Sequence, residues 1–307
     1  MKEGFNMHDI IIVGGGPAGL TAAIYGLRAG KSVLVIEKNG FGGQIAYSPK
    51  VENIPGTIQI SGAEFADKLT EQVMALGADV ELENVTSVET GEVFTVRTEE
   101  GSAFEGKTVI LALGVKHRML GLEQEEELIG NGISFCAVCD GAFYTNQHAA
   151  MIGGGNSALQ EALLLSEVCK KVTVVQNLPG FTGEKKLAEA LMAKDNVEVH
   201  FSTVVDGYRT ENGKFTGLDL KKDSGESFSV ACDGAFLAVG LEPQNGPFAD
   251  LADLNNWGYF DSAEDCLTKT PGLFVAGDCR SKRIRQVVTA SADGAIAAMA
   301  ACSYLDM

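Results

Sequence analysis

Apolar and polar positions along the chain follow a pattern that occurs twice. The apolar run Ile10–Val13 is followed by three glycines, then by a segment from Pro17 to Gly30 with apolar residues at helical spacing, and then by a second apolar run, Ser32–Glu37. Short apolar runs predict buried strands, and the helical spacing predicts a helix between them. The pattern therefore predicts a strand, helix, strand unit with parallel strands.

The same order recurs in the second half of the chain. Here the strand Ala149–Ile152 leads through a glycine loop into a helix over Ser157–Cys169 and a strand over Lys171–Gln176. Two such units predict an α/β protein with two Rossmann-like dinucleotide-binding domains. Each is expected to have three layers, with a parallel sheet at its centre.

Further strands decide where the domains begin and end. In the first half we expect a β-meander and a strand that returns to the first sheet, over Asp79–Val88, Phe94–Glu99 and Thr108–Leu113. In the second half the same roles are expected for Val197–Phe201, Thr216–Lys221 and Gly234–Val239. The last strand, Gly272–Ala276, and a helix over Thr289–Tyr304 have no sheet of their own and are assigned to the first domain. The first domain is therefore expected to be discontinuous, at residues 1–115 and 246–307, with the second inserted at residues 116–245.

Composition and charge limit the classes of partner. The 307 residues include 24 Lys and Arg against 41 Asp and Glu, a net charge of −17 that repels nucleic acid and anionic lipid. Uninterrupted apolar runs such as Val33–Ile36 fall far below the roughly 20 residues of a membrane span. The start of the chain, MKEGFNMHD, has no hydrophobic signal region. We expect a cytoplasmic protein that binds neither nucleic acid nor membrane.

The first glycine loop has the pattern of a dinucleotide site, G-x-G-x-x-G, at a strand-to-helix turn. Its first glycine permits the turn, the second admits a pyrophosphate, and the third lets the helix pack on the strand. An acid at the end of the next strand is placed to accept hydrogen bonds from a ribose. The residues expected at the dinucleotide are Gly14, Gly16, Pro17, Ala18, Gly19, Glu37 and Lys38.

The second loop, Gly153–Ala158, fits G-x-G-x-x-A, but the residues after its next strand do not suit a nicotinamide nucleotide. The segment from Val175 to Thr182 contains neither an acid for a free ribose hydroxyl nor an arginine for a 2′-phosphate. The loop is therefore either a site without the usual selecting residues or a piece of scaffold.

Cys136 and Cys139 form a C-A-V-C motif that is expected to start a helix, where two cysteines can share a disulfide and a thiolate is favoured. A zinc site would need two more ligands, and the sequence has no second C-x-x-C and no H-x₃₋₅-H pair, so we expect no metal. Asp140 either exchanges a proton with the leaving thiolate or caps the helix. The other cysteines are expected to be buried and inert: Cys169, Cys232, Cys266, Cys279 and Cys302.

A fourth motif, Gly277-Asp278, follows the apolar strand near the C-terminus. In a flavoprotein with two dinucleotide folds, such an aspartate is well placed to bind a ribityl chain. The basic residues that follow form either a positive surface patch or a solvated loop: Arg280, Lys282, Arg283 and Arg285.

In this order and spacing, the four motifs resemble the bacterial low-molecular-weight thioredoxin reductases over nearly the whole chain. The resemblance implies FAD in the first domain, thioredoxin as the disulfide partner and a homodimer. It implies that Cys139 is the flavin-proximal thiol, that Cys136 attacks the partner's disulfide, and that Asp140 is the acid. It also implies flavin contacts from Gly43, Gln44, Asn53, Val85, Gly277, Asp278, Arg285, Gln286 and Val287.

The departures from this family concern the electron donor. Where NADPH-dependent members carry His-Arg-Arg and a further Arg, this chain has Gln176, Asn177, Leu178 and Thr182. Each lost charge-assisted phosphate contact removes about 1.5–3 kcal/mol, so NADPH is expected to bind more weakly by several orders of magnitude. The pattern resembles the pyridine-nucleotide-independent branch, in which ferredoxin reduces the flavin directly, and the basic run could then dock ferredoxin. The alternatives are an NAD(P)H-dependent reductase, a flavin-dependent dithiol oxidase and a non-enzymatic flavin-bearing module.

Overall fold

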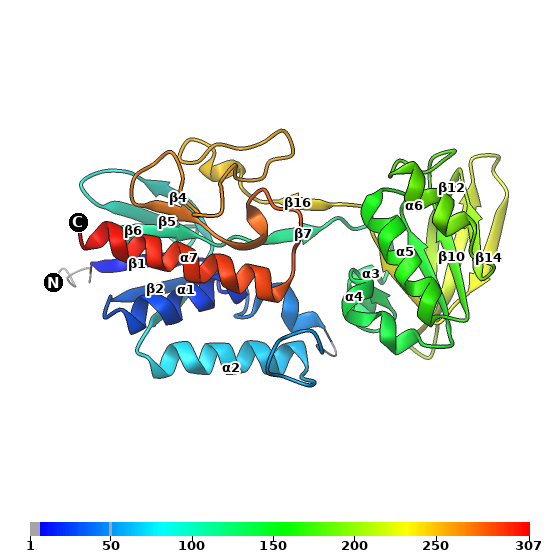
Figure 1. The fold of residues 1–307 in the computed structure, drawn as a ribbon, viewed down its shortest axis with the longest axis horizontal. Coiled ribbons are helices and arrows are strands. Elements are labelled where there is room, and N and C mark those ends of the chain that lie inside the picture. The colour runs from blue at the N-terminus through cyan, green and yellow to red at the C-terminus, as the bar shows by residue number, and fades with distance from the viewer. Residues whose placement is uncertain (1–6, 49–50) are drawn as a thin grey trace. The chain divides into compact units, whose positions relative to one another are not determined.

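The computed structural model describes residues 7–48 and 51–307 in two compact units (Figure 1). The first unit comprises Met1–Ala46, Ile54–Lys116 and Glu242–Met307, and the second comprises Tyr47–Asn53 and His117–Leu241. Most of the N-terminal segment that argued against a signal sequence lies outside the described residues. The mixed α/β fold with parallel sheets confirms the predicted fold class.

A seven-stranded sheet in the order β3-β2-β1-β6-β5-β4 forms the centre of the first unit, with β17 paired to β6. Its strands are β1 (His8–Val13), β2 (Val33–Glu37), β3 (Asp79–Leu82), β4 (Val85–Glu89), β5 (Phe94–Thr98), β6 (Ala103–Leu111) and β17 (Leu273–Val275). Its helices are α1 (Pro17–Arg28), η1 (Gly43–Tyr47), α2 (Gly62–Ala75), η3 (Gly246–Phe248), η4 (Gly277–Cys279) and α7 (Val287–Leu305).

Alternate residues of β1 and β2 point to opposite faces of this sheet, and both faces are covered by apolar side chains. Ile10 and Ile12 belong to a core that includes α1 and α7, and Ile11 and Val13 belong to a second core with Phe248. Figure 1 shows α7 alongside α1. The approach is close because a Cβ on Gly294 of α7 would stand 2.0 Å from the carbonyl oxygen of Ala18.

On the side away from β1, strand β6 divides its length between two partners. Its first half pairs with β5 in an antiparallel meander, and its second half pairs in parallel with β17. The prediction of one strand over Asp79–Val88 is wrong, because β3 pairs in parallel with β2 whereas β4 pairs antiparallel with β5. The extended segment is interrupted between β3 and β4 at Glu83. The carboxylate of Glu83 accepts hydrogen bonds from Thr98 and Ser102 of the meander.

The second unit has a five-stranded parallel sheet, β11-β10-β9-β15-β8, and a three-stranded antiparallel sheet, β12-β13-β14. The parallel strands are β8 (Ile133–Ser134), β9 (His148–Ile152), β10 (Lys171–Val175), β11 (Val197–His200) and β15 (Gly234–Leu237). The antiparallel strands are β12 (Thr203–Glu211), β13 (Lys214–Lys222) and β14 (Ser227–Ala231). The helices are α3 (Glu125–Leu128), α4 (Ala137–Asp140), η2 (Gly141–Tyr144), α5 (Asn156–Val168) and α6 (Lys185–Met192).

Three layers result in this unit. Met151 of β9 packs under α5, and Ile152 packs toward Leu218 of the antiparallel sheet. The expected meander strand at residues 197–201 is instead β11 of the parallel sheet, and the antiparallel sheet includes two strands that the sequence did not predict, β12 and β14. The chain passes between the units in β7 (Val115–His117) and β16 (Leu241–Pro243), which pair with each other.

By length and composition, α7 is the one helix among the described residues that could cross a membrane. It instead packs against α1 and contributes Ala297, Ala298 and Ala301 to the core of the first unit. It also holds a buried ion pair between Asp293 and Arg280. These contacts are those of a core helix.

Candidate active site

The first glycine loop joins β1 to α1 in a conformation that only glycine allows at two positions. Gly14 has φ of +109°, and a Cβ there would lie 2.3 Å from the carbonyl oxygen of Ala112. A Cβ on Gly19 would lie 1.8 Å from the carbonyl oxygen of Gly14, so this glycine lets the helix approach the strand. A Cβ on Gly16 would meet no atom nearer than 4.0 Å, which leaves space at the start of α1. Pro17 stands in the first helical turn, where no backbone N–H is needed.

Glu37 and the turn at Gly42 contact the glycine loop next to Gly16. The Glu37 carboxylate accepts hydrogen bonds from the amides of Gly15 at 2.7 Å and Asn39 at 3.0 Å. The amide of Gly42 donates to the carbonyl of Gly15 at 2.7 Å, and a Cβ on Gly43 would lie 3.3 Å from the Cα of Gly16. The structure therefore brings Glu37 and Gly43 to the glycine loop. Gln44, in η1, donates its side-chain amide to the carbonyl of Val115, and Lys38 is exposed after β2.

Gly277 and Asp278 reach the same helix from the C-terminal part of the chain. Gly277 has φ of +81°, and its missing Cβ would lie 2.8 Å from the Cβ of Ala18. Burial raises the pKa of Asp278 to about 6, against the opposing charges of Lys282 and Arg285. The Oδ1 atom of Asp278 is buried without a hydrogen-bond partner. This carboxylate is therefore prepared for a ligand group that donates a hydrogen bond.

Two of the four residues of the basic run have buried side chains, so neither a surface patch nor a solvated loop describes them. Arg280 is 4% exposed and binds Asp293 through two hydrogen bonds, at 2.7 and 2.8 Å. Lys282 binds the same carboxylate at 2.8 Å with a side chain that is 8% exposed. Burial disfavours the charge on Asp293, but hydrogen bonds from both cations lower its pKa. Arg283 is exposed, whereas Arg285 lies over the ring of Tyr259 and donates to the carbonyl of Asp278.

The remaining expected cofactor residues occupy different parts of the fold. Gln286 and Val287 form the start of α7, where the side chains of Gln286 and Thr289 make a reciprocal cap. Val85 begins β4 and packs against the core of the first unit. Asn53 lies in the segment Tyr47–Asn53, which groups with the second unit.

Cys136 and Cys139 form a disulfide, with Cα atoms 5.3 Å apart. Cys136 is the residue before α4, and its sulfur accepts a hydrogen bond from the amide of Cys139 at 3.2 Å. The predicted pair at a helix start is therefore confirmed, although α4 has only four residues. Val138, between the two cysteines, is exposed. The five other cysteines are buried, as predicted.

Two carboxyl groups flank this disulfide turn. Asp140 is 8% exposed, accepts a hydrogen bond of 2.6 Å from Ser134 Oγ and leaves Oδ1 without a partner. Burial raises the pKa of Asp140, and its side chain makes no helix cap, which removes the capping interpretation. Glu161, on α5, accepts a hydrogen bond of 3.0 Å from the amide of Ala137. Glu161 could not be predicted from the sequence, because nothing local connects a residue of α5 to the cysteine turn. Ser134, two residues before Cys136, was also not predicted.

The second glycine loop is covered by side chains of its own unit. Gln176 is 4% exposed, and a Cβ on Gly154 would lie 2.4 Å from its Nε2 atom. The amides of Thr182 and Gly183 donate to the carbonyl of Gly154 at 2.9 and 3.1 Å. Asn156, the first residue of α5, accepts a hydrogen bond from the amide of Glu184 at 2.7 Å. The glycine-loop fold is thus intact, and the segment after β10 is folded back on it without presenting a cation.

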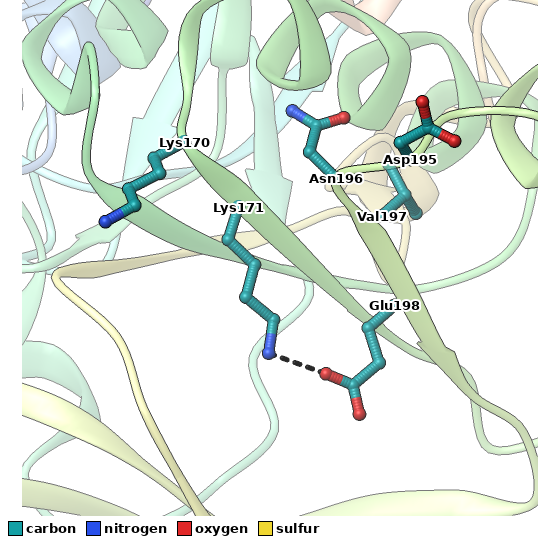
Figure 2. Close-up of a pocket in the computed structure, with 6 residues that line it drawn as sticks. All are labelled: Lys170, Lys171, Asp195, Asn196, Val197 and Glu198. Atoms are coloured by element: carbon teal, nitrogen blue, oxygen red, sulfur yellow. Dashed lines mark ion pairs between the residues drawn. The ribbon is translucent and has the colours of Figure 1, made fainter.

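A surface hollow of the second unit is lined by residues outside these motifs. Figure 2 shows its lining residues, Lys170, Lys171, Asp195, Asn196, Val197 and Glu198. These residues stand at the amino ends of β10 and β11, whereas ligands of parallel α/β sheets bind at the carboxyl ends. Lys171 is already paired with Glu198 at 2.7 Å. The hollow therefore receives no role in the chemistry of the cysteine pair.

Comparison with known proteins decides the family. The model of the pyridine nucleotide-disulphide oxidoreductases matches residues 8–294. The chain belongs to this family. A thioredoxin reductase of Treponema pallidum is 39% identical over 97% of both chains, and one of Bacillus subtilis is 36% identical over 98% of this chain and 95% of its own. The crystal structure of thioredoxin reductase from Streptococcus pyogenes superimposes with a TM-score of 0.92 at 37% identity, over 99% of both chains.

FAD is the cofactor of this oxidoreductase family, and the first unit fits it. The space at Gly16 suits the pyrophosphate at the start of α1, and the carboxylate of Glu37 suits a ribose. The unpartnered Oδ1 of Asp278 suits a hydroxyl of the ribityl chain. Bound there, FAD supplies a group that can take up and release two electrons.

Proposed function

We propose that this chain reduces the disulfide of a thioredoxin through Cys136 and Cys139. The observation that carries the proposal is their disulfide next to the buried carboxyl group of Asp140. The name thioredoxin reductase belongs to relatives that match nearly the full length, in support of this substrate. When bound in the first unit, FAD would supply the two electrons that open the Cys136–Cys139 disulfide.

Exchange with the partner then follows ordinary thiol chemistry. The thiolate of Cys136 attacks one sulfur of the partner's disulfide, the partner's S–S bond breaks, and a mixed disulfide forms. Cys139 next attacks the sulfur of Cys136, which restores the Cys136–Cys139 disulfide and releases the second partner sulfur. The enzyme dithiol loses two electrons and two protons, and the partner disulfide gains both. Because its pKa is raised by burial, Asp140 is suited to hold a proton for the leaving sulfur.

We also propose that the electron donor is a ferredoxin rather than NADPH. Gln176 occupies the space over Gly154, and the segment from Asn177 to Thr182 contains no cation for a 2′-phosphate. A one-electron protein carrier needs no nicotinamide pocket, because it can deliver electrons to the flavin one at a time.

The test is an anaerobic titration of the FAD-bound protein, in which the visible flavin absorption is followed. NADPH, NADH and reduced ferredoxin are added in separate samples, and oxidised thioredoxin follows. We expect only ferredoxin to bleach the flavin rapidly and thioredoxin to restore its colour, with restoration lost in Cys136→Ser. Rapid bleaching by a nicotinamide would overturn the donor proposal alone. Failure of thioredoxin to restore the colour would overturn the reductase proposal, and oxygen consumption with small dithiols would then indicate a dithiol oxidase.

A further inference from the structure

The two backbone amides on either side of the Cys136 side chain are each tied to an acid. The amide of Cys136 donates to Ser134 Oγ at 3.1 Å, and this hydroxyl donates to Asp140 at 2.6 Å. The next amide, that of Ala137, donates to Oε2 of Glu161 at 3.0 Å. The backbone on both sides of the Cys136 side chain is therefore held by two carboxyl groups. Asp140 of α4 acts through Ser134, and Glu161 of α5 acts directly.

Glu161 differs from Glu167, the other acid of α5. Glu167 is exposed and forms an ion pair with Lys194 at the surface. Glu161 is directed to the cysteine turn, 24 residues earlier in the chain. Burial raises the pKa of Glu161 to about 7, the hydrogen bond from Ala137 lowers it, and the charge of Asp140 raises it. No cation is among the described groups that shift this pKa.

We propose that Glu161 is a positioning residue of the redox turn, which holds the Ala137 amide and sets, together with Asp140, how readily Cys136 forms a thiolate. This role rests on the thioredoxin reductase function proposed above. When charged, Glu161 engages an amide that could otherwise stabilise the thiolate, and its negative charge opposes the thiolate. When Glu161 is protonated, it has no negative charge and no longer disfavours the Cys136 thiolate.

The groups that face Glu161 define the expected pH dependence. Asp140 is the charged group that shifts the pKa of Glu161, and Glu161 is hydrogen-bonded to the amide of Ala137, the residue after Cys136. Tyr144 of η2, which also feels the charge of Asp140, stays neutral because burial raises its pKa to about 12. Two acids and a thiol that interact with one another titrate as a coupled set. Ionisation of Cys136 in the reduced protein is therefore expected to show a second step near neutral pH, in addition to its main step.

The experiment measures the rate at which iodoacetamide alkylates Cys136 in the reduced, FAD-bound protein between about pH 5.5 and 9, with peptide mapping to identify the thiol. Glu161→Gln keeps a hydrogen-bond acceptor for Ala137 and removes the charge. Loss of a like charge lowers the thiol pKa by about one unit, which increases the thiolate fraction about tenfold. Because nucleophilicity falls with the pKa, we expect alkylation above about pH 8, where Glu161 of the wild type is charged, to be up to about three- to fourfold faster. The step near neutrality is expected to disappear.

Glu167→Gln is the matched control, with the same substitution on the same helix, and its profile is expected to match the wild type. If the Glu161→Gln and wild-type profiles superimpose, the proposal is overturned. If Glu161→Gln does not fold, Asp140→Asn provides the second test, because removal of the Asp140 charge should move the step to lower pH. A step that stays in place would overturn the proposal. Alkylation needs neither thioredoxin nor an electron donor, so its outcome is independent of the proposed function.

Discussion

Replacement of Asp293 by asparagine tests whether a buried charge cluster holds the cofactor-binding turn in place. Asp293 is 4% exposed and accepts hydrogen bonds from Arg280, Lys282 and the amide of Gly277. Asparagine keeps the shape of the side chain but leaves two buried cations without a counter-charge. Removing one partner of a buried ion pair costs about 3–5 kcal/mol. The same change also loosens the amide of Gly277, next to Asp278.

The assay is urea unfolding of the FAD-bound protein, followed by circular dichroism and by flavin release. With a slope of about 2–3 kcal/mol per M, the midpoint is expected to fall by about 1–2.5 M. Asp253→Asn is the control, because its ion pair with Lys269 is exposed and such pairs contribute about 0–1 kcal/mol. A loss below about 1 kcal/mol in Asp293→Asn would show that the cluster contributes no more than a surface pair, and the reasoning would be refuted.

Three further predictions concern separate features. Gly16→Ala is expected to fold normally but to lose FAD, because its Cβ enters open space at the predicted pyrophosphate site, whereas Gly19→Ala is expected to fold poorly; flavin content and urea midpoints distinguish the two. Tyr208→Phe removes a hydrogen bond of 2.6 Å to the buried carboxylate of Glu125 and is expected to destabilise the second unit by about 1–3 kcal/mol, measured by urea unfolding. In flavin-free protein, the raised pKa of Asp278 makes its charge unfavourable in the folded state. The charged side chain should therefore lower the free energy of unfolding increasingly as the pH rises from about 4 to about 6. Asp278→Asn should therefore be more stable than wild type above that window and equal to it below, and equal stability at all pH values would contradict the prediction.

The sequence predicts those parts of the fold and site that depend on short segments. Gly14–Gly19 and Gly153–Ala158 each combine an apolar strand, a glycine loop and a helix within about 30 residues, so their local pattern is sufficient. The cysteine turn is equally local. In contrast, the break at Glu83 depends on hydroxyl groups of Thr98 and Ser102 that are distant in sequence, and an alternating pattern alone cannot show it.

Long-range pairing explains the error in the basic patch. The run from Arg280 to Arg285 reads as a surface feature until its partner is known, and that partner is on the following helix. One signal was available, because Asp293 is the only acid in the long apolar segment Val287–Leu305. A charge in such a segment is stable only when it is paired, so the cations just before the helix were candidates for burial. Glu161 gave no comparable signal.

The division of the first unit into three chain segments affects the order in which the protein can be built. The early helix α1 buries its small residues against α7, and β6 is completed by β17, yet both partners are among the last residues synthesised. The intervening 125 residues of His117–Leu241 carry their own sheets and cores, so they have what they need to fold while the ribosome is still active. A chain that stops before residue 273 would therefore have a folded cysteine turn in its second unit. The sheet of its first unit would lack β17, and one apolar face of that sheet would lack its covering helix α7. Such a fragment would be a client for chaperones and proteases, and flavin would be acquired only after the last helix is released.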